Sequence, residues 1–141
     1  MKKVALVAAA VAVGIVFTLI LIPSEKSERT QIFHARLADP RIYQDGLFSD
    51  SFHISQGTYE FRFVPNGDSP EILTITLSGP SFSFSEDFVL EGTLHETGIS
   101  KYYTWNYLGQ TIIEIPEEQQ LSITIDPHGN TLGPVSVYLI K

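Results

Sequence analysis

The sequence predicts an all-β domain, a two-sheet antiparallel sandwich of about ten strands with a jelly-roll-like arrangement, preceded by one N-terminal transmembrane helix. Three observations lead to this prediction. Nine of the ten glycines and seven of the eight prolines lie beyond residue 30, at intervals too short for most helices. The segments between them alternate apolar and polar residues with a period of two, as half-buried strands do. The first 23 residues, by contrast, are nearly all apolar.

The alternation assigns one set of side chains to the core and the other to solvent. In the stretch 58–64, Tyr59, Phe61 and Phe63 share one face, while Glu60 and Arg62 point the other way. Such a strand is buried on one side only. The same pattern, bounded by turn residues, predicts ten strands, at residues 33–37, 52–54, 58–64, 73–77, 82–84, 88–94, 102–108, 111–115, 121–125 and 135–140.

The apolar N-terminus is long enough to span a bilayer. An uncharged run of 19 residues starts at Val4 and ends at Ile22, and as a helix it measures about 28 Å, close to the ~30 Å hydrocarbon core. The alternative is a cleavable signal peptide, which has a shorter apolar region and small residues before the cleavage site, whereas bulky Ile22 precedes Ser24 by two positions. We therefore predict a retained anchor, with Lys2 and Lys3 on the cytoplasmic side and the rest of the chain outside.

The chain divides into an anchor at residues 1–23, a polar stalk at 24–30 and one extracytoplasmic β-sandwich domain at 31–141. This predicts a single-pass protein of the cell membrane, with the lipid bilayer as partner of residues 4–22. From residue 24 onward, seven basic and sixteen acidic residues leave a net charge of −9. Such a surface repels the phosphates of nucleic acids, so no nucleic-acid partner is expected.

The residue types that most enzymes and metal centres need are missing or scattered. The absence of cysteine excludes disulfides, thiol catalysis and cysteine-ligated metals. No Gly-x-Ser-x-Gly, His-Glu-x-x-His or phosphate-binding glycine loop is present. The histidines His34, His53, His95 and His128 have no ligand-pair spacing. We expect a protein that is not an enzyme and that has no cofactor. The alternative is a protein that binds calcium.

Oxygen-rich turns provide the candidate calcium ligands. Asp126 and Asn130 bracket one turn, Asp68 lies in a second, and Asp87 belongs to a third acidic stretch. Calcium takes about six to eight oxygen ligands, often from such loops. The alternative is that aspartate, asparagine, proline and glycine are here because tight turns require them.

Residues 101–108 form the most aromatic part of the chain. Alternation puts Tyr103, Trp105 and Tyr107 on one face and Tyr102 and Asn106 on the other. Exposed aromatic side chains stack on sugars or anchor protein partners. The interpretation we favour makes Tyr103, Trp105 and Tyr107 a stripe of the sandwich core. It leaves Tyr102 and Asn106 exposed as candidate contacts with a ligand or partner.

Three stretches carry a resemblance to known proteins: GTYEFRFVPNGDSP at 57–70, IDPHGN at 125–130 and GPVSV at 133–137. They resemble small membrane-anchored β-sandwich proteins of archaea and, more loosely, the jelly rolls of emp24/GOLD-type and pre-peptidase C-terminal domains. The resemblance implies a binding or structural role and carries over no functional residue. The chain departs from the emp24 pattern because it lacks the paired cysteines and has its apolar segment at the N-terminus.

These observations favour a non-catalytic interaction module, or an accessory subunit of a membrane or cell-surface complex with a membrane or surface protein as partner. The alternative is a calcium- or carbohydrate-binding surface domain. A hydrolase is a third possibility, which requires an apolar cleft in which a histidine and a carboxylate converge.

Overall fold

The structure is a computed structural model that describes residues 29–141. The predicted anchor at 1–23 and residues 24–28 of the predicted stalk lie outside the described residues. Arg29 and Thr30 lead directly into the first strand. Among residues 29–141, no helix combines the length and the apolar character needed to cross a membrane.

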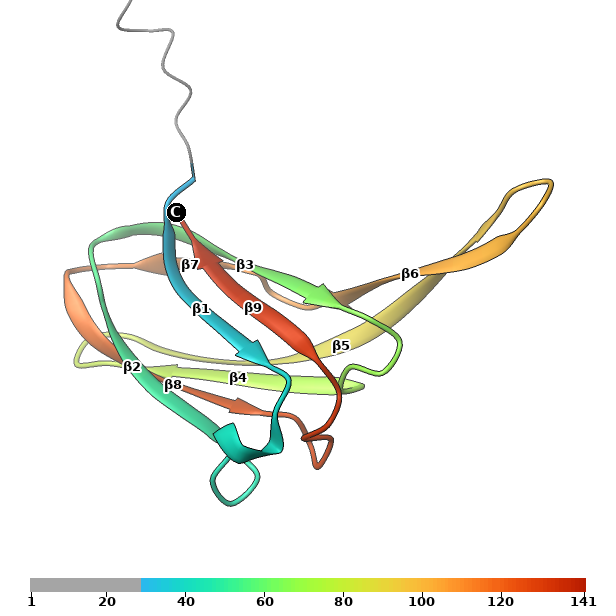
Figure 1. Ribbon diagram of the computed structural model, residues 1–141. Helices are drawn as coiled ribbons and strands as arrows, with labels where there is room; N and C mark the ends of the chain where they lie inside the picture. Colours follow the sequence, from blue (N-terminus) through green and yellow to red (C-terminus); the bar gives the residue numbers. More distant parts are fainter. Residues whose placement is uncertain (1–28) are drawn as a thin grey trace, which may run out of the picture.

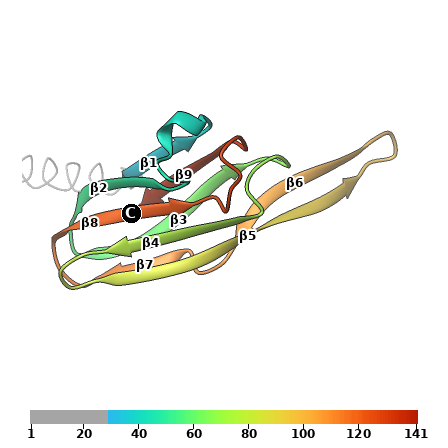
Figure 2. The same ribbon diagram turned by 90° about the horizontal axis from the view of Figure 1, so that it is seen from below.

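The described residues form two antiparallel β-sheets packed face to face (Figures 1 and 2). The four-stranded sheet has the order β1 (Gln31–Leu37), β9 (Val135–Ile140), β3 (Gly57–Pro65) and β7 (Ile112–Ile115). The five-stranded sheet has the order β2 (Phe48–Ile54), β8 (Gln119–Asp126), β4 (Ile72–Ser78), β5 (Ser83–Glu96) and β6 (Lys101–Leu108). One turn of 3-10 helix, η2 (Pro40–Ile42), lies between β1 and β2. The prediction of an all-β, two-sheet antiparallel sandwich is confirmed.

Strand β5 joins two strands that the sequence pattern separates. The predicted strands at 82–84 and 88–94 are one continuous strand, so their separation is wrong, and residues 29–141 contain nine strands where about ten are expected. The polar pair Glu86 and Asp87 suggests a break, yet the alternation continues through it. Glu86 occupies an inward position between Phe84 and Phe88, and its carboxylate accepts a hydrogen bond from the Gln110 backbone N–H at 3.1 Å.

The core lies between the sheets and contains many aromatic rings. Phe61 of β3 packs against Phe88 of β5 with ring centroids 5.8 Å apart, and Phe63 lies 4.9 Å from the same Phe88 ring. Phe33 of β1 stacks on Phe52 of β2 at 5.1 Å. Each pair joins one sheet to the other. Because a buried phenylalanine contributes up to about 3 kcal/mol, these rings are a main source of stability.

The hairpin of β5 and β6 extends beyond the sandwich. Strand β4 pairs with β5 only as far as the pair of Ile72 with Val89, and Leu90 donates one more hydrogen bond to Glu71, so residues 91–96 pair with β6 alone. Figures 1 and 2 show the two strands leaving the body of the domain as a long two-stranded ribbon. The four-stranded sheet therefore covers only part of the β5–β6 hairpin.

Two buried tyrosines near the root of this hairpin differ in how their hydroxyls are satisfied. The Tyr107 hydroxyl donates to the Pro70 carbonyl oxygen at 2.6 Å, and burial raises the pKa of Tyr107, which keeps it a donor. The Tyr43 hydroxyl is buried and has no hydrogen-bond partner among residues 29–141. A buried hydroxyl without a partner costs about 1–3 kcal/mol, whereas a paired one contributes about 1 kcal/mol.

The matched substitutions Tyr43→Phe and Tyr107→Phe should therefore shift stability in opposite directions. We expect Tyr43→Phe to raise the free energy of unfolding by about 1 kcal/mol, because it removes an unpaired hydroxyl. Tyr107→Phe should lower it by about 1–2 kcal/mol, because it leaves the Pro70 carbonyl unpaired. Denaturant unfolding followed by circular dichroism measures both changes. A destabilised Tyr43→Phe variant would contradict the expectation.

Candidate functional site

The two faces of the β5–β6 hairpin carry different side chains. In the register, Leu94 is opposite Tyr103 and Gly92 is opposite Trp105, so these side chains share the face that continues the core. The Tyr103 and Trp105 rings stack, with centroids 5.8 Å apart. We call Leu94, Tyr103 and Trp105 the aromatic patch. Ile99, in the turn at the tip, is 99% exposed.

Two glycines make room for the indole of Trp105. A Cβ atom at Gly92, on the neighbouring strand, would lie 2.7 Å from Cζ3 of Trp105. A Cβ atom at Gly67, in the turn between β3 and β4, would lie 3.1 Å from Cζ2. The indole therefore lies against the backbone of both segments, which fixes the root of the patch to the sandwich.

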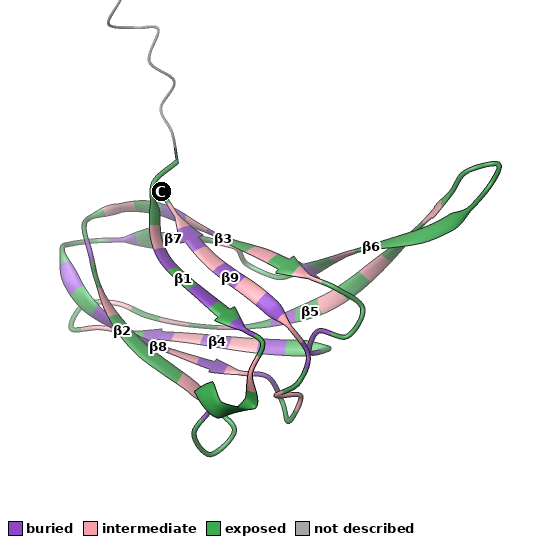
Figure 3. Ribbon diagram, viewed as in Figure 1, coloured by how far each residue is buried: buried purple, intermediate pink, exposed green. Residues whose placement is uncertain are grey.

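The aromatic patch is exposed because the four-stranded sheet does not reach it. Tyr107 is 2% exposed and packs on Phe63 of β3, with ring centroids 5.1 Å apart. Trp105, which is two residues nearer to the tip of the hairpin, is half-buried. Tyr103, which is two residues farther along, is 56% exposed. Figure 3 shows the change from buried to exposed residues along β6. The interpretation of a single core stripe is right for Tyr107 and wrong for Tyr103.

The predicted contact residues Tyr102 and Asn106 lie on the opposite face of the hairpin. Tyr102 is 51% exposed and stacks on His95 at 4.9 Å, and His95 in turn lies 2.7 Å from the Thr104 hydroxyl. Asn106 is exposed, and its side-chain oxygen accepts a hydrogen bond from the Tyr107 backbone N–H at 2.9 Å. The two residues are therefore accessible, but they are separated from the aromatic patch.

The predicted calcium ligands are mostly engaged in turn hydrogen bonds. The Asp126 carboxylate accepts from the His128 N–H, and the Asn130 side chain accepts from the Gly133 N–H, both at 2.8 Å. Asn130 also donates to the backbone carbonyl of Asp68 at 3.1 Å. Among residues 29–141, no three histidine, aspartate or glutamate side chains are grouped as a metal site requires. Calcium binding by Asp126, Asn130, Asp68 and Asp87 stays a prediction.

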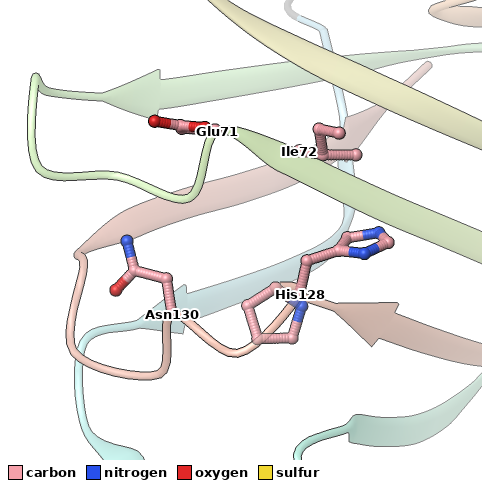
Figure 4. A pocket seen from close by; sticks show the side chains of 5 residues that line it. Glu71, Ile72, His128 and Asn130 are labelled. Atoms are coloured by element: carbon pink, nitrogen blue, oxygen red, sulfur yellow. The ribbon is translucent and has the colours of Figure 1, made fainter.

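A shallow hollow lies next to the turn between β8 and β9. It has a volume of about 310 Å³ and is lined by Glu71, Ile72, Pro127, His128 and Asn130 (Figure 4). One of these lining residues, His128, also contacts β4: the Thr74 hydroxyl lies 2.6 Å from Nε2 of His128 and 2.5 Å from the Asp87 carboxylate. No sequence pattern indicates this grouping, because its three members are on β4, β5 and a turn.

The direction of the hydrogen bonds decides what this grouping can do. An ionised carboxylate only accepts, so the single Thr74 hydroxyl proton points to Asp87. His128 must then donate from Nε2 to Thr74, and it cannot also take the hydroxyl proton there. A nucleophile needs a base that accepts its proton, as in a serine hydrolase. The three side chains therefore form a chain of hydrogen bonds from His128 through Thr74 to Asp87, in which the imidazole is not the base for the hydroxyl.

The outer face of the five-stranded sheet carries two rows of hydroxyl side chains. Each row consists of residues that are directly paired across β2, β8, β4 and β5. All side chains in the two rows are uncharged. The first row is Ser51, Ser122, Ser78 and Ser83, and the second is Ser49, Thr124, Thr76 and Ser85. Their spacing follows from the sheet, about 4.8 Å between strands and about 7 Å between rows. No local sequence pattern predicts these two rows, because only the register of the four strands brings the eight residues together.

Comparison of the chain with models of protein families, with curated proteins and with solved structures gave no match. The resemblance to archaeal β-sandwich proteins and to emp24/GOLD-type and pre-peptidase C-terminal domains therefore stays a prediction. The geometry of the hairpin and of the outer sheet face is the basis for assigning a function.

The close approach of Trp105 to Gly92 can be tested with the only tryptophan in the chain. Gly92→Ala should displace the indole towards solvent and shift its fluorescence to longer wavelength, because the new methyl group would occupy the space of the ring. Gly98→Ala is the matched control, since a Cβ atom there meets nothing within 4 Å. Equal emission spectra of the two variants would show that the indole does not lie against Gly92.

Proposed function

We propose that the protein is a non-catalytic interaction module, anchored in the cell membrane through residues 4–22, whose extracytoplasmic domain binds a protein partner through the β5–β6 hairpin. The observation that carries this proposal is the exposed aromatic patch, with Ile99 at the tip beyond it. Contiguous exposed apolar side chains on a soluble domain mark interaction sites. Tryptophan and tyrosine are, in addition, enriched among the residues that dominate binding energies.

The strand order supports the view that the hairpin is an addition to a simpler fold. Without β6, two four-stranded sheets remain, and every connection except that from β4 to β5 passes from one sheet to the other. This order is typical of a jelly roll, which we propose as the finer description of the sandwich. The parts of β5 and β6 beyond Leu90 and Tyr107 lie outside the core of buried residues. Their retention is consistent with a role in binding.

The hydrogen bonds at Thr74 support a non-catalytic role. Among residues 29–141, this is where a hydroxyl, an imidazole and a carboxylate come together beside a hollow. Since His128 donates to the hydroxyl, the imidazole is not a base for it, and the grouping lacks the order of nucleophile, histidine and carboxylate that a serine hydrolase uses. The hollow is also shallow, with a glutamate and an asparagine in its lining, rather than the apolar cleft that a hydrolase site needs.

Substitution of Ile99 by serine should weaken capture of the partner without affecting the fold, because this side chain is fully exposed. We expect the full-length chain, solubilised in detergent from its native membrane, to bring down a stoichiometric companion. Ile99→Ser, combined with Tyr103→Ser, should reduce the captured amount at least tenfold. Leu132→Ser is the matched control, since Leu132 is 75% exposed in the β8–β9 connection, outside the hairpin. Quantitative mass spectrometry of the captured material measures the difference.

Two results would contradict this function. Equal capture by the hairpin variant and by Leu132→Ser would show that the hairpin is not the binding element. Recovery of the full-length chain in the soluble fraction, without detergent, would show that residues 4–22 do not anchor it.

Carbohydrate binding is a second candidate function, favoured by the two hydroxyl rows and by Tyr102 and Asn106 on the same outer face. Uncharged hydroxyls at regular spacing offer donors and acceptors to a polysaccharide, and Tyr102 offers a ring for stacking. We expect binding on a glycan array, with and without calcium, to fall severalfold in Thr124→Val and in Tyr102→Ala. Thr124→Val keeps the shape of the side chain and removes only the hydroxyl. No signal from the unaltered full-length chain would remove this candidate.

A further inference from the structure

The outer edge of β6 has unpaired backbone groups. In an antiparallel pair, alternate residues turn their N–H and C=O groups to the partner strand, and the others turn them away. Two hydrogen bonds fix the phase here: Leu90 N–H to the Glu71 carbonyl, on the β4 side of β5, and Thr97 N–H to the Ser100 carbonyl, across the hairpin turn. Residues 102, 104, 106 and 108 therefore face β5. Lys101, Tyr103, Trp105 and Tyr107 face outward.

Among residues 29–141, nothing pairs with the edge from Lys101 to Trp105. Strand β6 is the last strand of its sheet. At its root the Asn106 side chain occupies the Tyr107 N–H, so the edge is closed there and open towards the tip. Natural sheets protect such edges with proline, bulges or inward charges. The register of β6 has no bulge, its eight residues include no proline, and its one charged residue, Lys101, is at the end.

The open edge and the aromatic patch belong to the same residues. Tyr103 and Trp105 direct their backbone groups outward and their side chains to the uncovered face. A strand added at about 4.8 Å from β6 would place every second side chain beside these rings. Apolar side chains at alternate positions would cover the patch, and the side chains between them would lie on the opposite face.

The charge around the hairpin indicates which side chains the partner strand has between its apolar positions. From residue 83 to 108 there are four carboxylates, Glu86, Asp87, Glu91 and Glu96, against one ammonium group, that of Lys101. Lys101 lies 3.3 Å from Glu96, which offsets it. At the root, Arg62 is similarly 3.4 Å from Glu60. A basic segment gains from this field, whereas an acidic segment or a second copy of this acidic domain is repelled.

We propose that the edge of β6 binds an extended segment of a partner protein, apolar at alternate positions and basic between them, which adds to the sheet as an antiparallel strand. We choose antiparallel addition because all seven strand pairs of the described domain are antiparallel. This inference rests on the proposed function as an interaction module, and it specifies how and what the hairpin binds.

A synthetic peptide of ten alternating valine and arginine residues, with blocked ends, is the probe. We expect it to bind the detergent-solubilised full-length chain saturably, with a change in the fluorescence of Trp105. The same peptide with glutamate in place of arginine should bind at least tenfold more weakly. Tyr103→Pro, which removes an outward N–H, should weaken binding at least tenfold more than Tyr103→Ala, which removes only the side chain.

Methylation of the peptide nitrogens separates strand addition from simple contact and leaves the protein unchanged. Valines opposite Tyr103 and Trp105 would donate their N–H groups to β6, and the arginine N–H groups would face away. N-methylation of the valines should therefore weaken binding at least tenfold, and N-methylation of the arginines should change it less than threefold. This readout holds even where Tyr103→Pro fails to fold.

Three outcomes would overturn the inference. Equal affinity of the two methylated peptides would exclude strand addition, and preference for the glutamate peptide would exclude a basic partner. A concentration-dependent dimer that Tyr103→Pro abolishes would assign the edge to a second copy. In each case, loss of the captured companion in the Ile99 and Tyr103 variant would still support the proposed function, so the two failures are distinguishable.

Discussion

Burial of two apolar sheet faces against each other is the interaction on which the structure depends. The chain has no cysteine, so no disulfide reinforces the domain. Phe61 and Phe63 on one sheet meet Phe88 on the other, and Phe33 meets Phe52 farther along. Without these contacts between layers, neither sheet could stay folded, because each has one face that water would solvate poorly.

The surface that we propose for binding arises where this packing stops. The alternation of β5 and β6 continues unchanged past the edge of the four-stranded sheet, so one pattern yields a core residue at Tyr107 and an open ring at Tyr103. Trp105, against Gly92 and Gly67, lies at the boundary and connects the two regions. The hairpin therefore needs no separate stabilising cluster. Its root is part of the core, and its tip is free for a partner.

Local patterns predicted the strands, and long-range packing limited the rest. The strand at 58–64 was predictable because alternation and turn residues are both local. The apparent break in β5 comes from the polar residue Glu86 at an inward position. Its carboxylate accepts a hydrogen bond from Gln110, which is far away in the sequence, so a local pattern does not show that this position can belong to a strand. The exposure of Tyr103 depends on how far β3 extends over β6, and the hydroxyl rows depend on the register of four strands. Neither property is encoded within a short window.

The first strand also determines how the domain responds to force. The chain enters β1 at the end of the sheet where Lys141 donates its backbone N–H to the Thr30 carbonyl, and β1 runs from there alongside β9 (Figure 1). Its hydrogen bonds lie perpendicular to the strand. A pull on the chain at Arg29 along the strand axis therefore loads all of these bonds together, in shear. The hydrogen bonds between β1 and β9 resist such tension together and do not unzip one at a time.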